Sequence, residues 1–265
     1  MSEDVYEVYA LKYAERNARV RTDSFLFDDH SAPHPMDYYL WVARNAARTV
    51  VIDTGYDAEE GVRRGRPILR DPLACLADFG IAADEVETVI LTHLHYDHAG
   101  GTDAFPKARF HLQDAEAAYA TGRCMCHDFL RFPFDEEDVV RMVRLNFRGR
   151  IGFHDGMSEL CDGLELHAIG GHSAGLQAVR VYTRRGWVVV ASDASHFYAN
   201  YRNRLVFPVV YDIPRLLDGY GTIRRLADSD DHVIPGHDAL VMELYPAPSP
   251  ELEGMAVRLD VPPRS

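Results

Sequence analysis

A chain of 265 residues can bury the core of one large α/β domain or two small ones. Its formal net charge of −13 argues against a surface that binds nucleic acid, because contacts to phosphate dominate that affinity. No apolar run reaches the roughly 18 residues of a membrane helix, no secretory signal is visible, and four cysteines do not suggest a disulfide scaffold. We therefore expect a cytoplasmic protein with no membrane or nucleic-acid partner.

Strands and helices alternate along the chain, which is typical of an α/β protein. Strands are predicted over 5–13, 38–43, 49–53, 86–92, 109–112, 164–169, 178–183, 187–192 and 232–235. Helices are predicted over 69–80, 114–120, 136–146 and 214–227. The stretch 121–151 is rich in Met, Phe and Arg and predicts a covering segment. The end of the chain, 246–265, contains five prolines and predicts a surface strap.

Residues 93–98 read His-Leu-His-Tyr-Asp-His and directly follow the apolar run 87–92. A structural loop does not need three imidazoles and a carboxylate in six residues. His93 and His95 alternate along an extended segment, so their side chains can point together. Asp97 and His98 lie just past the bend and can aim at a second point nearby. One short segment can therefore begin two metal sites.

Further ligand-type residues stand just beyond later predicted strands. Imidazole and carboxylate without thiolate suit zinc, iron, manganese or cobalt rather than a Cys-rich structural zinc site. Seven ligands are too many for one tetrahedral ion and suit two ions that share a carboxylate. The candidate ligands are His93, His95, Asp97, His98, His172, Asp193 and His237. We expect two divalent ions, with Zn first and Mn, Fe or Co as alternatives.

This ordered ligand set resembles the full pattern of the metallo-β-lactamase superfamily, over a span from Asp53 to His237. The resemblance implies a four-layer αβ/βα sandwich with the site at one edge, between the two sheets. It implies one domain over residues 1–265, with a covering insertion around 121–151. It assigns His93, His95 and His172 to one ion, Asp97, His98 and His237 to the other, and Asp193 to both. Asp53 is expected to support the site without binding metal.

Within the superfamily, the motifs His-Leu-His-Tyr-Asp-His-Ala-Gly-Gly (93–101) and Gly-His-Ser-Ala-Gly (171–175) are similar to the N-acyl-homoserine lactone lactonase branch. In that branch a tyrosine three residues after the bridging aspartate helps polarise the lactone carbonyl. This chain has His196 at that position and Tyr198 two residues further on. Either side chain could donate a hydrogen bond to a developing oxyanion. The predicted catalytic residues are therefore Asp97, Asp193, His196 and Tyr198.

The resemblance implies a hydrolase in which a hydroxide held between two metals attacks a lactone carbonyl, and Asp193 passes a proton to the leaving alkoxide. N-acyl-homoserine lactones are the first substrates expected, with Tyr96, Phe25 and Met36 in the substrate pocket. The alternatives are another lactone or ester, or a thioester cleaved as in glyoxalase II. A phosphodiesterase that processes nucleic acid is disfavoured by the charge. A homodimer, with contacts from 121–151, is a further expectation.

Overall fold

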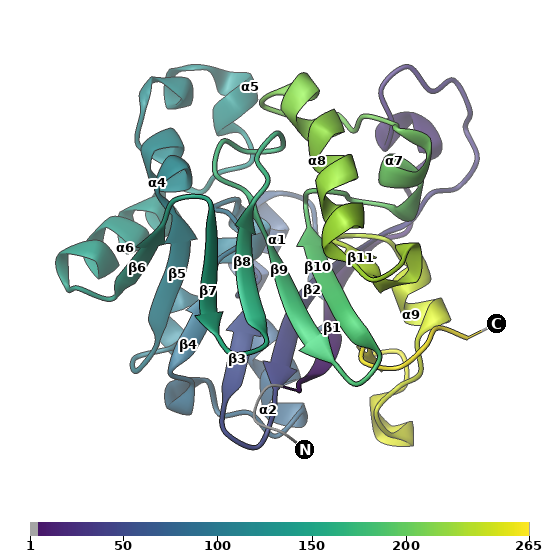
Figure 1. The fold of residues 1–265 in the computed structure, drawn as a ribbon. Helices are drawn as coiled ribbons and strands as arrows, with labels where there is room; N and C mark the ends of the chain where they lie inside the picture. The colour runs from purple at the N-terminus through teal and green to yellow at the C-terminus, as the bar shows by residue number, and fades with distance from the viewer. Residues whose placement is uncertain (1–4, 265) are drawn as a thin grey trace.

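Two β-sheets stacked face to face form the centre of the computed structural model, which describes residues 5–264 (Figure 1). The larger sheet has the order β12-β1-β2-β3-β4-β5-β6, and the smaller has the order β11-β10-β9-β8-β7. The larger sheet comprises β1 (Glu7–Arg16), β2 (Met36–Arg44), β3 (Thr49–Ile52), β4 (Thr88–Ile90), β5 (Arg109–Gln113), β6 (Ile151–His154) and β12 (Ala256–Arg258). The smaller comprises β7 (Met157–Cys161), β8 (Leu164–Ala168), β9 (Gln177–Thr183), β10 (Gly186–Ser192) and β11 (Val233–Pro235).

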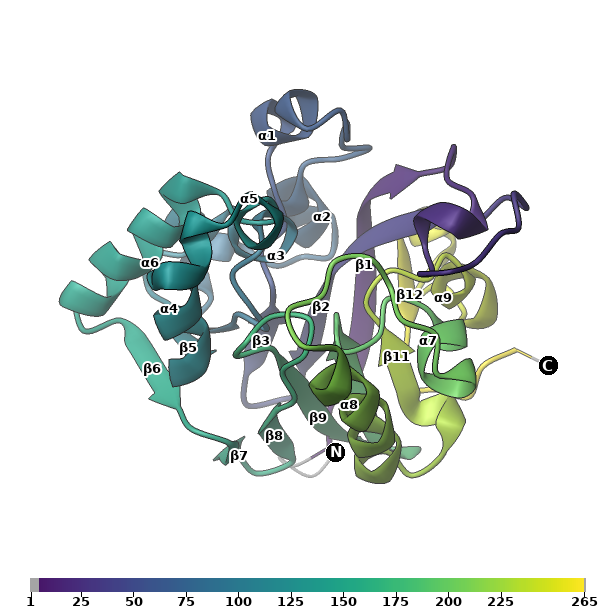
Figure 2. The same cartoon turned by 90° about the horizontal axis from the view of Figure 1, so that it is seen from above.

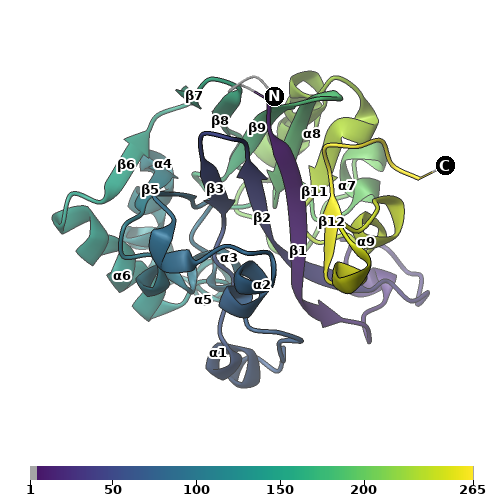
Figure 3. The same ribbon diagram turned by 90° about the horizontal axis from the view of Figure 1, so that it is seen from below.

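Helices cover the outer faces of both sheets. The helices are α1 (Ala58–Arg63), α2 (Pro72–Asp78), α3 (Tyr96–Ala99), α4 (Asp114–Ala120), α5 (Asp128–Arg131), α6 (Glu136–Phe147), α7 (Tyr198–Asn203), α8 (Ile213–Leu226) and α9 (Leu240–Leu244). Viewed from above, α8 lies against the smaller sheet while α4 and α6 lie on the side of the larger sheet (Figure 2). Viewed from below, α2 lies over β1 and β2 (Figure 3). This is the four-layer αβ/βα sandwich that the sequence predicted.

The side chains of strand β2 show why a hydrophobic core forms on each face of the larger sheet. Tyr39 and Trp41 face the smaller sheet and belong to the core between the sheets. Leu40 and Val42 point the other way, into the core beneath the helices. Because side chains alternate along a strand and both faces are covered, this segment has no polar side and reads as a continuous apolar run. No helix between residues 5 and 264 is long and apolar enough to span a bilayer.

Five loops meet at one end of the sandwich. β3, β4, β5 and β6 are parallel, as are β10 and β11, so their carboxyl ends share an edge. Ligand sites of open α/β sheets form at such edges. The loops after β3, β4, β8, β10 and β11 bring residues from both sheets to this end, at the top of Figure 1.

The proline-rich end of the chain corrects one sequence prediction. We predicted a surface strap over 246–265, but Ala256–Arg258 form β12, which pairs antiparallel with β1 at the edge of the larger sheet. Leu259 continues into the core and is fully buried. A three-residue strand is too short to show a period in the sequence, and the surrounding prolines mask it. The short helices α1, α3, α5, α7 and α9 and the strands β6 and β7 were also not predicted.

If the end of the chain is part of the core, Leu259→Ala destabilises the protein. Removing a fully buried leucine leaves a cavity, and we expect a loss of about 3 kcal/mol in the free energy of unfolding, measured by urea denaturation. The matched control is Leu69→Ala, since Leu69 is 59% exposed and its truncation should cost under about 0.5 kcal/mol. Equal losses in the two variants would contradict the placement of β12.

Candidate metal centre

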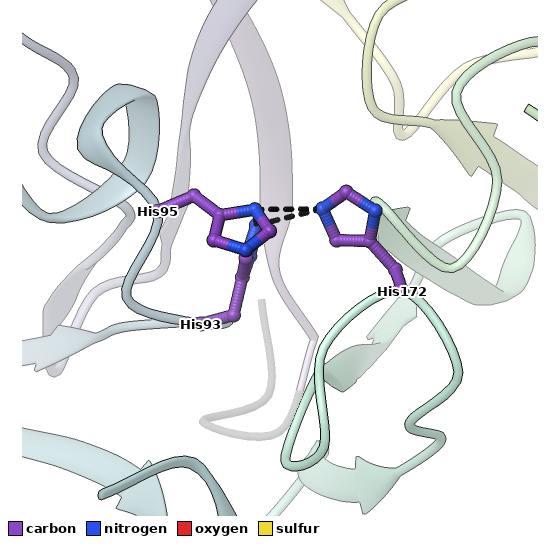
Figure 4. A group of neighbouring side chains, drawn as sticks. All are labelled: His93, His95 and His172. Carbon is purple, nitrogen blue, oxygen red and sulfur yellow. Dashed lines mark hydrogen bonds between the residues drawn. The ribbon is translucent and has the colours of Figure 1, made fainter. Parts of the chain in front are cut away.

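Three imidazoles converge at the end of the two sheets. His93 and His95 come from the loop after β4, and His172 comes from the loop after β8 (Figure 4). The Nε2 of His172 lies 3.2 Å from the Nε2 of His93 and 2.9 Å from the Nδ1 of His95, and the latter two nitrogens are 3.0 Å apart. Three nitrogens that converge on one point have the arrangement of three ligands around one cation.

A second group of ligand atoms lies beside the first. The Nε2 atoms of His98 and His237 lie 3.9 Å and 3.8 Å from the Oδ2 of Asp97. Asp97 and His98 belong to the short helix α3, and His237 follows β11. All three side chains are buried. One segment, 93–98, therefore contributes to both groups, as its spacing predicted.

Asp193 lies between the two groups. Its Oδ2 is 3.1 Å from the Nε2 of His172, and its Oδ1 is 3.1 Å from the Nε2 of His237 and 3.4 Å from that of His98. Gly236 makes room for this carboxylate, because a Cβ at that position would stand 2.5 Å from Oδ1. Oδ2 is also 3.3 Å from the Nε2 of His237. The carboxylate of Asp193 thus reaches both groups, which is the placement that a bridging ligand requires.

Hydrogen bonds at the far nitrogen fix the orientation of several rings. The Nδ1 of His172 donates to the carbonyl oxygen of Val209 (2.7 Å), and the Nδ1 of His237 donates to that of Asp37 (2.8 Å). A carbonyl oxygen only accepts, so the proton of each neutral ring sits on Nδ1. The lone pair on Nε2 then points into the site, which is the form that binds a metal.

The chemistry and the contacts of these candidate ligand atoms suit divalent metal ions. The Nε2 of His98 and the Oδ1 of Asp193 are buried and have no hydrogen-bond partner in the described part of the chain. Such groups carry a desolvation cost unless something pairs with them. Nitrogen and oxygen donors without thiolate suit Zn, Mn, Fe or Co. Two ligand groups joined by one carboxylate suit two ions.

The pKa values of the site follow from burial and from these neighbours. Burial, and then the nearby imidazoles, hold the pKa values of His93 and His95 well below their usual range. Burial also acts on His98, but the carboxylates of Asp193 and Asp53 outweigh it and raise the pKa of this ring well above its usual value. His93 and His95 are thus neutral and able to bind metal, and the surroundings of His98 favour positive charge.

Asp53 supports the site from beneath, as the sequence indicated. Its carboxylate accepts hydrogen bonds from the backbone N–H of Thr92 (2.7 Å), the hydroxyl of Thr92 (2.8 Å) and the Nδ1 of His98 (2.7 Å). The residue has a φ of 62°, in the left-handed region that few residues other than glycine adopt, although aspartate and asparagine enter it more often than most. Burial raises the pKa of this carboxyl, and His98 opposes that shift. Asp53 therefore ties the loop that follows β4 to the ring of His98.

Glu116 is a buried carboxylate that the sequence did not single out. It accepts from the backbone N–H groups of Leu94 (3.0 Å) and Gly175 (2.9 Å) and from the hydroxyl of Ser173 (2.7 Å). It thereby joins the loop of His93 and His95 to the loop of His172. A glutamate in a predicted helix is ordinarily exposed, so no local pattern distinguishes this one.

A cavity of about 170 Å³ opens onto the ligand groups. Tyr96 and Met36, predicted to be in the substrate pocket, line it. Phe25 is not among the lining residues, because its ring packs against His34 and Phe197. The sequence did not predict several of the residues in this wall. These are Arg16, Arg19, Asp23, Tyr38, Arg66, Pro133, Pro208 and Val209.

The two predicted oxyanion donors occupy different places. Tyr198 is outside the cavity wall, in the core between the sheets, where its ring lies 6.3 Å from that of Tyr201. His196 lines the cavity, and its Nε2 lies 2.9 Å from the Oδ2 of Asp193. Burial lowers the pKa of His196 to about 3, so the ring is neutral at pH 7 and its one N–H faces Asp193. His196 is placed to orient Asp193.

Comparison with known proteins agrees with this geometry. A family model described as the metallo-beta-lactamase superfamily matches residues 36–241. The chain belongs to the metallo-β-lactamase superfamily. It is 32% identical over 184 residues to the N-acyl homoserine lactonase AiiB of Agrobacterium fabrum, covering 63% of this chain and 65% of that relative, just under two thirds of its length. A probable metallo-hydrolase of Mycobacterium tuberculosis is 25% identical over 205 residues, covering 71% of this chain and 66% of that protein.

Solved structures of the superfamily share the fold. A quorum-quenching N-acyl homoserine lactone lactonase superposes with a TM-score of 0.73 at 20% identity, covering 90% of this chain and 95% of that one. AidC, described as a dizinc quorum-quenching lactonase, superposes with a TM-score of 0.61 at 16% identity, covering 87% and 86%. These likenesses support the four-layer architecture.

Asp53→Asn should weaken metal binding without unfolding the protein. The amide cannot offer His98 and Thr92 the charged acceptor that the carboxylate does, so we expect metal affinity to fall about 10- to 100-fold in a competition titration with a chelator. Asp57→Asn is the matched control, because Asp57 caps α1 at the surface and asparagine caps equally well. Unchanged affinity in Asp53→Asn would contradict the supporting role.

Proposed function

We propose that this protein is a metal-dependent hydrolase that opens a lactone ring, with N-acyl-homoserine lactones as the first substrates to test. The observation that carries the proposal is the position of Asp193, whose carboxylate lies 3.1 Å from an imidazole nitrogen of each of the two groups. The similarity to AiiB, a lactonase by name, supports the choice of substrate class.

In this proposal, His93, His95 and His172 hold one divalent ion, Asp97, His98 and His237 hold the other, and Asp193 touches both. We expect zinc, with Mn, Fe or Co as alternatives. When bound, two such ions lower the pKa of a shared water and polarise a carbonyl oxygen.

The side chains around the ions then have distinct tasks. Asp193 faces the reacting centre and is the group placed to carry a proton to the alkoxide that leaves when the ring opens. His196 donates to Oδ2 of Asp193 and holds that carboxylate in position. The ring of His196 is itself stacked on Phe207, with centroids 3.7 Å apart, which restricts its rotation.

Tyr38 is a better oxyanion donor than either residue predicted from the sequence. Its hydroxyl is buried, has no hydrogen-bond partner in residues 5–264, and belongs to the wall of the cavity. Its ring lies 5.0 Å from that of His237, beside the second ligand group. A buried unpaired donor in the reaction cavity can stabilise charge that develops on a carbonyl oxygen.

Asp193→Asn tests the proposed role of the carboxylate. We expect lactone hydrolysis, followed as proton release with a pH indicator, to fall at least about 100-fold, because the amide can neither carry the proton nor bridge as a charged ligand. Asp71→Asn is the control, since Asp71 is an exposed residue that caps α2 and is not part of the cavity wall. Wild-type turnover by Asp193→Asn with its metal bound would rule the assignment out.

Tyr38→Phe removes only a hydroxyl. If that hydroxyl stabilises the oxyanion, kcat falls on the order of 100-fold while the metal content stays at the wild-type value. Tyr182→Phe serves as the control, because Tyr182 is 39% exposed and outside the cavity wall. An unchanged kcat in Tyr38→Phe would remove this tyrosine from the mechanism.

A further inference from the structure

Three arginines from two parts of the chain line the cavity that opens onto the ligand groups. Arg16 is the last residue of β1, Arg19 lies in the loop after it, and Arg66 lies between α1 and α2. The whole chain carries a net charge of −13, so three cations at one small cavity run against its overall balance. The overall charge of the chain therefore does not explain why three arginines line this cavity.

None of the three arginines forms an ion pair with a carboxylate of the described chain. The Nη2 of Arg19 donates to the hydroxyl of Ser24 (3.2 Å) and to the backbone carbonyl of Asp23, while its Nε is buried without a partner. Arg66 donates from Nη1 to the hydroxyl of Tyr96. The guanidinium groups thus retain donors that no protein acceptor uses.

The three charges also lie close to one another. Burial lowers the pKa of Arg19, the charges of Arg16 and Arg66 lower it further, and Tyr38 and Asp23 oppose the shift without reversing it. The guanidinium of Arg66 is held between aromatic rings, 5.1 Å from the centroid of Tyr96 and 5.9 Å from that of Phe132. Like charges held together repel, so an anion bound among them would be strongly stabilised.

Burial disfavours the charge of Arg19 and of Arg66, and the carboxylates of Asp23 and Asp97 act to raise the pKa values of these two arginines, but neither forms an ion pair with an arginine of the wall in the described residues. Asp97 and Asp193 belong to the ligand groups, where histidines surround them. Asp23 is the remaining acidic residue of the wall. Two divalent ions would make the cavity more positive still. A neutral substrate would leave this charge without a partner, whereas an anionic one would pair with it.

We propose that Arg16, Arg19 and Arg66 bind an oxyanion group of the substrate, a carboxylate or a phosphate, at a distance from the bond that is cut. Guanidinium donors match the geometry of both groups. The inference rests on the proposed lactone hydrolysis and narrows it. The preferred substrates are lactones or esters that carry a negative charge, ahead of uncharged acyl-homoserine lactones.

Matched substrates test this specificity. The metal-loaded protein is assayed with a γ-lactone bearing a carboxylate, the same lactone bearing a phosphate, and its neutral carboxamide. We expect kcat/KM for at least one charged lactone to exceed that for the carboxamide by about tenfold or more. The stronger of the two charged substrates identifies the oxyanion. Equal or better hydrolysis of the carboxamide would overturn the inference and leave lactone hydrolysis intact.

Variants connect the preference to the arginines. Arg19→Met and Arg66→Met should each reduce the charged-to-neutral ratio of kcat/KM several-fold or more, and the ratio cancels any general loss of activity. Arg148→Met is the matched control, because Arg148 is exposed at the end of α6 and should leave the ratio unchanged. A ratio that is unchanged in both cavity variants would overturn the inference.

A binding measurement separates this inference from the proposed function. Calorimetry on the metal-loaded protein compares glutarate with its monoamide, which differ by one carboxylate. We expect glutarate to bind about tenfold more tightly, with the difference lost in Arg19→Met and Arg66→Met and reduced at high salt. This result would support the anion site even if no lactone were hydrolysed. Equal affinities for the two compounds would overturn it whatever the enzyme hydrolyses.

Discussion

The carboxylate of Asp193 is the contact on which the rest of the site depends. It faces imidazoles that come from both sheets, since His98 follows β4 of the larger sheet and His172 and His237 follow β8 and β11 of the smaller one. Burial raises the pKa of this carboxyl, and the surrounding imidazoles outweigh burial and hold it well below its usual range. An ionised carboxylate in the core requires positive partners, which the ring of His98 and the proposed metal ions would supply.

Hydrogen bonds around the candidate metal ligands explain why so many polar groups can be buried at the ends of the sheets. Asp53 fixes His98, Glu116 joins the loops of His93 and His172, and the carbonyl of Val209 orients the ring of His172. Each of these contacts leaves a ring nitrogen directed inward, or holds in place a loop that bears one. A buried polar group destabilises the fold when it has no hydrogen-bond partner, whereas a network in which every group is paired is stable. The candidate metal ligands and the residues that hold them therefore act together.

Much of the fold and of the candidate ligand set could be predicted from the sequence, because the signals lie in short stretches of the chain. The apolar run 87–92 followed by residues 93–98 indicates both a strand end and a cluster of ligands, and later strands end similarly at His172, Asp193 and His237. The order of these motifs carried the resemblance that gave the architecture. A local signal also marks the end of α2. Gly80 follows this helix with a left-handed φ of 75°, a conformation that glycine adopts readily.

What could not be predicted depends on contacts between distant segments. Tyr38 belongs to an apolar strand, and only the packing around it shows that the residue lines the cavity and that its hydroxyl has no hydrogen-bond partner among residues 5–264. Arg66 is distant from Arg16 and Arg19 along the chain, and the sequence alone does not show that the three line one cavity. Tyr198 is near Asp193 in sequence, yet the turn into α7 places its ring in the core. Proximity in sequence therefore favoured, beside His196, a tyrosine that is not part of the cavity wall.

The most direct test of the dinuclear site is a crystal structure of the purified protein with anomalous diffraction collected at the absorption edge of the metal that it contains. We expect two anomalous peaks, one among His93, His95 and His172 and one among Asp97, His98 and His237, with Asp193 between them. One peak alone, or a peak that Asp193 does not contact, would contradict the dinuclear site.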